Sequence, residues 1–188
     1  MILNIPNSLT LIRIAFIPII IIMFYLPFEW ARPASAWLYG LACVTDWFDG
    51  YLARKLGQSS TFGAFMDPVA DKLIVAVALI LLVSAHPEVI IVLGTCIIIG
   101  REIIITALRE WMARQGKSDS VAVSMLGKYK TFVQMFALGF LLHRDDWYGL
   151  PTHTIGLILL VIATILTIVS MVEYMKAGWQ EMSQNPGE

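Results

Sequence analysis

Four aspartates lie close enough in the sequence to bring their carboxylates to one place. They are Asp46, Asp49, Asp67 and Asp71, in a chain of 188 residues that is 58% apolar and 14% charged. One ionised carboxylate at the centre of a bilayer costs about 2.5–3.5 kcal/mol, so four unpaired ones would cost on the order of 10–14 kcal/mol. That cost is comparable with the whole stability of a folded domain. The four charges therefore need a partner that neutralises them.

Divalent cations suit this cluster best. Mg²⁺ is a hard cation that proteins hold through carboxylates together with substrate phosphates, and Mn²⁺ accepts similar ligands. Two such ions would balance four carboxylates, whereas the nearby cationic side chains are Arg54 and Lys72. The alternative is the ion pathway of a transporter, because intramembrane carboxylates also occur there. A transporter is expected to carry carboxylates near the midplane and across repeats, and this chain has one cluster.

Two predicted helices, residues 34–56 and 61–85, must present these carboxylates to one another. We expect them to form an antiparallel hairpin around residues 57–60, with the aspartates of one helix opposite those of the other. Spacings of three and four residues place side chains on one helix face. The faces defined in this way hold Asp46, Asp49, Gly50 and Ala53 on the first helix and Gly63, Asp67 and Asp71 on the second. The glycines on these faces let either a ligand or a second helix approach the backbone.

Hydropathy predicts an all-α, polytopic integral membrane protein with six transmembrane helices. The mean hydropathy is +0.75, and a helix that crosses a bilayer needs about 20 mostly apolar residues. We expect residues 1–188 to form a single membrane domain, the first span to be retained rather than cleaved, and Asn7 or Ser8 to cap the first helix. The six predicted spans are 9–27, 34–56, 61–85, 88–114, 122–143 and 153–176.

The distribution of basic residues predicts that both termini and the aspartates face the cytoplasm. Most of the 13 lysines and arginines fall on the side of the bilayer that holds the termini, as the positive-inside rule requires. The net charge of −1 gives no indication of nucleic-acid binding. Cys43 and Cys96 lie in apolar segments and are expected to be free thiols.

The aspartates belong to a longer pattern, D-x-x-D-G-x-x-A-R-x8-G-x-x-x-D-x-x-x-D, which starts at Asp46 and ends at Asp71. The pattern resembles the signature of the CDP-alcohol phosphatidyltransferases, and every signature position matches. The stretches NIPNSLTLIRIAFIP, TDWFDGYLAR and REIIITALREW resemble the branch of this family that uses glycerol 3-phosphate. The resemblance implies a six-helix enzyme of the bacterial cytoplasmic membrane, surrounded by membrane lipids and forming a homodimer.

The resemblance also implies a reaction and a role for each signature residue. A phosphatidyl group would pass from CDP-diacylglycerol to sn-glycerol 3-phosphate by in-line attack, with another acceptor, inositol phosphate or serine, as the alternative. Two divalent cations, Mg²⁺ or Mn²⁺, would be held by Asp46, Asp49, Asp67 and Asp71. Asp71 would also act as the general base. Contacts to CDP-diacylglycerol would come from Gly50, Ala53, Arg54, Ser60 and Gly63.

A phosphate-bearing acceptor needs cationic side chains, and Arg101 is the first candidate because an arginine within IIIGREIII is otherwise costly. Its alternative role is a buried ion pair with Glu102 or an aspartate. Arg109, Lys128 and Lys130 are further candidates, although each could instead contact lipid headgroups. The three histidines, His86, His143 and His153, show no metal-ligand spacing and are expected to be surface or interfacial residues.

Overall fold

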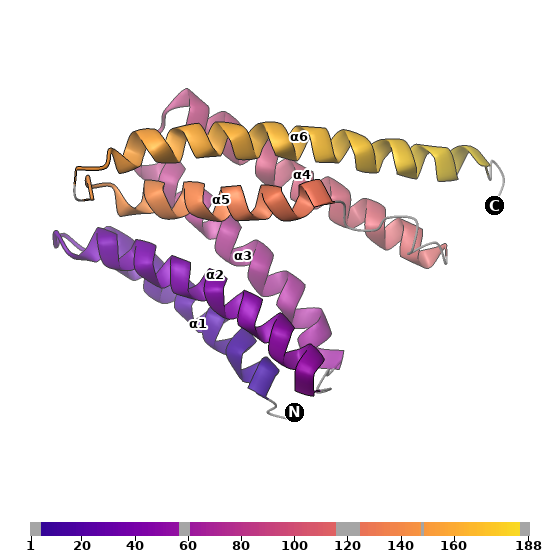
Figure 1. Cartoon of the computed structure of the whole chain (residues 1–188), viewed down its shortest axis with the longest axis horizontal. Helices are drawn as coiled ribbons and strands as arrows, with labels where there is room; N and C mark the ends of the chain where they lie inside the picture. The colour runs from indigo at the N-terminus through magenta and orange to yellow at the C-terminus, as the bar shows by residue number, and fades with distance from the viewer. Residues whose placement is uncertain (1–4, 57–60, 116–124, 148, 185–188) are drawn as a thin grey trace.

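The chain folds into six α-helices, as predicted, and the part described by the computed structural model contains no β-strand (Figure 1). The structure describes residues 5–56, 61–115, 125–147 and 149–184. The helices are α1 (Ile5–Tyr25), α2 (Ala31–Leu56), α3 (Thr61–Ala85), α4 (Val89–Arg114), α5 (Met125–His143) and α6 (Thr152–Gln184). Five of them lie close to the predicted spans, and α6 continues well past residue 176.

Four helices, α1, α3, α4 and α6, are each long and apolar enough to cross a bilayer, judged over the described residues. Their outward faces carry apolar side chains such as Ile22, Ile80 and Leu93, all more than half exposed. Such a surface is stable against lipid, where exposed apolar groups need no further cover. Helix α2 is less apolar because it carries Asp46 and the charged end of the signature. The chain is therefore a multi-pass membrane protein.

The helices pack so that α1 lies against both α2 and α3, whereas α2 and α3 have little contact with each other. The turn of the predicted hairpin, residues 57–60, lies outside the described part of the chain; within that part, α1 contacts each arm of the hairpin more extensively than the two arms contact each other. The polar face of α1, which holds Asn7, Thr10 and Arg13, is almost fully buried and explains the difference. Because those side chains offer hydrogen-bond donors, α1 can pack on the helices that carry the acids.

The sequence analysis expected Asn7 or Ser8 to cap the first helix, and this prediction is wrong. Helix α1 already begins at Ile5, so Asn7 and Ser8 lie within its first turns. Asn7 is only 4% exposed. A polar side chain near a helix start can cap the helix or take part in tertiary packing, and here the packing of α1 uses these positions.

Among the described residues, helices α5 and α6 form the most extensive helix–helix contact, and they approach each other closely at Gly156. A Cβ atom at Gly156 would lie 2.7 Å from Cγ of Leu141 and 3.1 Å from its backbone nitrogen. Since backbone cannot move aside as a side-chain tip can, Gly156→Ala should lower the free energy of unfolding by about 1–3 kcal/mol. Thermal unfolding of the purified protein in detergent measures this loss.

Gly139 on α5 provides the matched control, because a Cβ atom built there has no other atom within 4 Å. Gly139→Ala should be neutral or slightly stabilising, since alanine favours a helix over glycine by about 1 kcal/mol. Equal melting temperatures for the two variants would contradict the close packing of α5 on α6.

Candidate active site

One large cavity, of about 900 Å³, is lined by residues of α2, α3, α4, α5 and α6. Its lining combines acidic side chains from α2 and α3 with basic side chains from α4 and α5. This cavity therefore collects residues from distant parts of the sequence. Its charged and phenolic lining residues are Asp46, Asp67, Asp71, Lys72, Arg101, Glu102, Arg109, Glu110, Lys130 and Tyr174.

Three of the four predicted aspartates line this cavity. Asp67 and Asp71 lie one turn apart on α3, so their carboxylates share a face, and Asp46 reaches the same space from α2. Asp71 opens to the cavity, and among the residues that the structure describes no side chain donates a hydrogen bond to it. A carboxylate in that position can accept a cation or the proton of a bound hydroxyl group.

Helix α1 supplies two partners for these carboxylates that the sequence analysis missed. Arg13 Nη1 lies 2.6 Å from Asp46 Oδ1 and donates a hydrogen bond within an ion pair. The Thr10 hydroxyl donates to Asp67 Oδ1. Arg13 is 1% exposed, so this charge is held inside the protein. The spacing of Thr10 and Arg13 along one face of an apolar helix was the available signal.

The remaining signature positions can be described only in part. Helix α2 includes four of them, Asp49, Gly50, Ala53 and Arg54, but the structure describes only their backbone. Ser60 lies wholly outside the described part of the chain. Gly63 is buried near the start of α3, one turn before Asp67. The roles of these residues remain predictions.

The basic side of the cavity is organised by Glu102. Arg101 Nη1 and Lys130 Nζ both donate to the same carboxylate oxygen, Oε1 of Glu102, at 2.9 Å and 2.7 Å. Arg101 and Lys130 are nearly buried, at 8% and 4% exposure. The ion pair between Arg101 and Glu102, one of the two alternatives for Arg101, is thus present. It does not remove Arg101 from the cavity, which the same side chain lines.

Tyr174 of α6 extends this basic group toward Arg109. Arg109 Nη2 donates to the Tyr174 hydroxyl at 3.1 Å, and the guanidinium carbons of Arg109 and Arg101 lie 5.2 Å and 5.5 Å from the centre of its ring. Such cation–π contacts hold two arginines at a defined separation. The predicted acceptor residues Arg101, Arg109 and Lys130 therefore share one cavity, whereas the side chain of Lys128 is outside the described part.

The donor set fits a hard divalent cation. Asp46, Asp67 and Asp71 supply carboxylate oxygens to one cavity, and these are the ligands that Mg²⁺ and Mn²⁺ prefer. Within the described residues the cation that pairs directly with them is Arg13, and Lys72 instead donates to Thr106 at 2.7 Å. The ion pair with Arg13 offsets one of the three described carboxylates, and the other two remain as potential ligands for a metal ion.

Comparison with known proteins gives a consistent result. The sequence model of the CDP-alcohol phosphatidyltransferase family matches residues 3–169. A protein of Salmonella choleraesuis (strain SC-B67) named CDP-diacylglycerol–glycerol-3-phosphate 3-phosphatidyltransferase is 49% identical over 175 residues, which cover 93% of this chain and 94% of that protein. A protein of the same name from Escherichia coli (strain K12) is 48% identical over the same shares. The chain therefore belongs to the CDP-alcohol phosphatidyltransferase family, as its aspartate signature predicted.

Proposed function

We propose that this chain transfers the phosphatidyl group of CDP-diacylglycerol to sn-glycerol 3-phosphate, giving phosphatidylglycerol phosphate and CMP. The observation that carries the proposal is the single cavity in which the acids of α2 and α3 meet the basic group of α4 and α5. A diphosphate donor with its metal ions needs the first set of charges, and an anionic acceptor needs the second. The names of the two relatives described above agree with this pair of substrates.

The acidic side is the donor site. Asp46, Asp49, Asp67 and Asp71 would hold two divalent cations, Mg²⁺ or Mn²⁺. When bound, such ions stabilise negative charge on the attacking and leaving oxygens of a phosphoryl group. The nucleotide and diphosphate of CDP-diacylglycerol would lie along the faces formed by Gly50, Ala53, Arg54, Ser60 and Gly63. Arg13 and Thr10 orient Asp46 and Asp67 by the bonds that they donate.

The basic side is the acceptor site. Arg101, Arg109 and Lys130 place three positive charges around Glu102, and the other acid on α4 that lines the cavity, Glu110, is paired with Arg114. This group therefore attracts an anion. Arginine and lysine bind phosphate through short, charge-assisted hydrogen bonds. Because Glu102 holds Arg101 and Lys130 on one oxygen, their positions are fixed before the acceptor arrives. Lys128 is a further candidate in the same group.

Asp71 is the general base. Its carboxylate opens to the cavity and, within the described residues, receives no side-chain hydrogen bond. It would take the proton of the acceptor hydroxyl while that oxygen forms a bond to the phosphorus that carries diacylglycerol. The bond from this phosphorus to the bridging oxygen of CMP breaks, and CMP leaves with the electron pair. The step needs no nucleophile of the enzyme and forms no covalent enzyme intermediate.

The site also agrees with the location we propose, the bacterial cytoplasmic membrane with both termini and the cavity facing the cytoplasm. CDP-diacylglycerol is held in the bilayer by its acyl chains, and glycerol 3-phosphate comes from water. With its charged residues toward the cytoplasmic side of the membrane, the cavity would be reached from both phases. We also propose that the protein forms a homodimer in the membrane.

A comparison of three acceptors tests the proposed function. Purified protein with Mg²⁺ and radiolabelled CDP-diacylglycerol is offered glycerol 3-phosphate, inositol phosphate or serine in separate reactions. We expect CMP release and a labelled phospholipid only with glycerol 3-phosphate. Turnover with a different acceptor alone would reject the proposed substrate but keep the family, and solute or proton flux in sealed vesicles without CMP release would favour the transporter alternative.

A further inference from the structure

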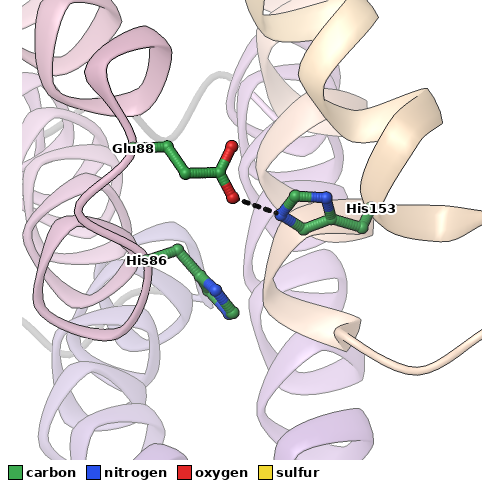
Figure 2. Close-up of side chains that lie close together, drawn as sticks. All are labelled: His86, Glu88 and His153. Carbon is green, nitrogen blue, oxygen red and sulfur yellow. Dashed lines mark ion pairs between the residues drawn. The ribbon is translucent and has the colours of Figure 1, made fainter.

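A second group of potential metal ligands lies far from the aspartates, at the end of the bundle where α3 leads to α4 and α5 leads to α6. His86 follows the last residue of α3, Glu88 precedes the first residue of α4, and His153 lies in the first turn of α6 (Figures 1 and 2). The sequence separates His153 from the other two by more than 60 residues. The sequence spacing gave no indication of a metal site at these two histidines, and the structure brings both of them next to Glu88.

The three ligand atoms lie close to one another. The nitrogen and oxygen ligand atoms of His86, Glu88 and His153 are all within 4.8 Å of one another. His153 Nε2 lies 3.2 Å from Glu88 Oε1. Neighbouring ligands of a tetrahedral zinc ion, bound at about 2.0–2.1 Å, are separated by about 3.3 Å. One edge of such a site is thus in place, and a side-chain rotation of His86 would complete the set.

The environment of His86 favours binding of a metal ion. Its Nε2 atom is buried, and no hydrogen-bond partner for it is found among the described residues. The His86 and His153 rings lie 5.4 Å apart, centre to centre. Pro87 restricts the backbone between His86 and Glu88 and so helps to hold both in place.

We propose that His86, Glu88 and His153 form a binding site for a zinc-class divalent ion that ties the ends of α3, α4 and α6 together. Two imidazoles and one carboxylate with an open fourth position suit Zn²⁺. Mg²⁺ prefers carboxylate and phosphate oxygens, so this site and the aspartate site select different metals. With the orientation proposed above, the ion would be bound at the outer surface of the membrane.

Nearby positive charges set the strength of this site. Arg32 and Arg144 both act on His86 electrostatically and disfavour a second cation. Arg32 stacks on the Phe24 ring, with its guanidinium carbon 3.7 Å from the ring centre, and is drawn toward Asp145. We therefore expect reversible binding with weaker affinity than that of a fully cysteine-ligated structural zinc site.

Equilibrium dialysis of the full chain tests the proposal. The protein is purified in detergent without a polyhistidine tag, stripped with a chelator and dialysed against Zn²⁺ in a large excess of Mg²⁺, which competes for the aspartates. We expect about one zinc ion per wild-type chain, as a single three-ligand site requires. His153→Ala should lose this ion, and Glu88→Gln, which keeps the side-chain shape, should weaken binding at least about tenfold, as removal of a ligand does.

His143→Ala is the matched control, because His143 lies at the same end of the bundle and its Nδ1 contacts the Asp145 carbonyl oxygen, at 3.0 Å, rather than the three proposed ligands. This variant should bind zinc as the wild type does. Zinc should also raise the melting temperature of wild type and His143→Ala, and leave that of His153→Ala unchanged. Absence of zinc from the wild type, or equal zinc in wild type, His153→Ala and Glu88→Gln, would overturn the proposal whatever the activity of the enzyme.

Discussion

Replacing Asp71 with asparagine is expected to lower kcat about 10³-fold, because a general base contributes on the order of 10²–10⁴ to the rate. Asparagine keeps the size of the side chain but cannot accept the proton of the acceptor hydroxyl. Asp71 also belongs to the proposed metal ligands, so the variant removes one charged ligand as well. CMP release from CDP-diacylglycerol, measured with saturating Mg²⁺ and glycerol 3-phosphate, gives the loss.

The pH profile separates the base from a purely structural role. Below the pKa of an essential base, kcat/KM rises with pH, because only the deprotonated enzyme reacts. In Asp71→Asn, the residual kcat/KM should no longer rise with pH in the range where Asp71 loses its proton in the wild type. Asp146→Asn is the control, since Asp146 is exposed and lies outside the cavity. A kcat within about threefold of wild type for Asp71→Asn would remove Asp71 from the mechanism, because a general base contributes at least about 10².

Replacing Arg101 with glutamine is expected to raise the KM for glycerol 3-phosphate about 10- to 100-fold. A hydrogen bond to a charged group contributes about 1.5–3 kcal/mol, and Arg101 is the most buried arginine on the basic side of the cavity. The KM for CDP-diacylglycerol should change little, because the donor site lies on the acidic side. Initial rates measured with each substrate varied in turn separate the two effects.

Arg114→Gln on the same helix is the matched control. Arg114 is 77% exposed and pairs with Glu110 at 2.6 Å, an exposed pair of the kind that contributes little to stability. Neither KM should change in that variant. If Arg101→Gln raised both KM values equally, or neither, Arg101 would be a structural partner of Glu102 rather than an acceptor contact.

The sequence was sufficient to predict the class of fold and the family. Helix periodicity and apolar length depend on neighbouring residues, so six helices could be placed along the chain with ends close to those observed. The grouping of the signature aspartates could be predicted because it also depends on local spacing. Asp67 and Asp71 are four residues apart, and a helix brings such residues to one face whatever surrounds it.

Contacts between distant helices could not be predicted in the same way. Arg13 and Asp46 are 33 residues apart, and Thr10 and Asp67 are 57 apart, so nothing local couples them. The predicted hairpin of α2 and α3 did not include α1, which packs against both helices in the structure. Which polar side chain meets which acid depends on this packing.

The sequence by itself determined that the chain is helical, belongs to the membrane and carries the signature of its family, because these properties follow from composition, periodicity and spacing. Only the tertiary structure decided that Glu102 holds Arg101 and Lys130 together, that α1 serves the aspartates, and that His86, Glu88 and His153 meet at the other end. The physical reason is that a hydrogen bond or a metal–ligand bond forms only over a few ångströms. Distances of that size between separate helices are fixed by how the helices pack.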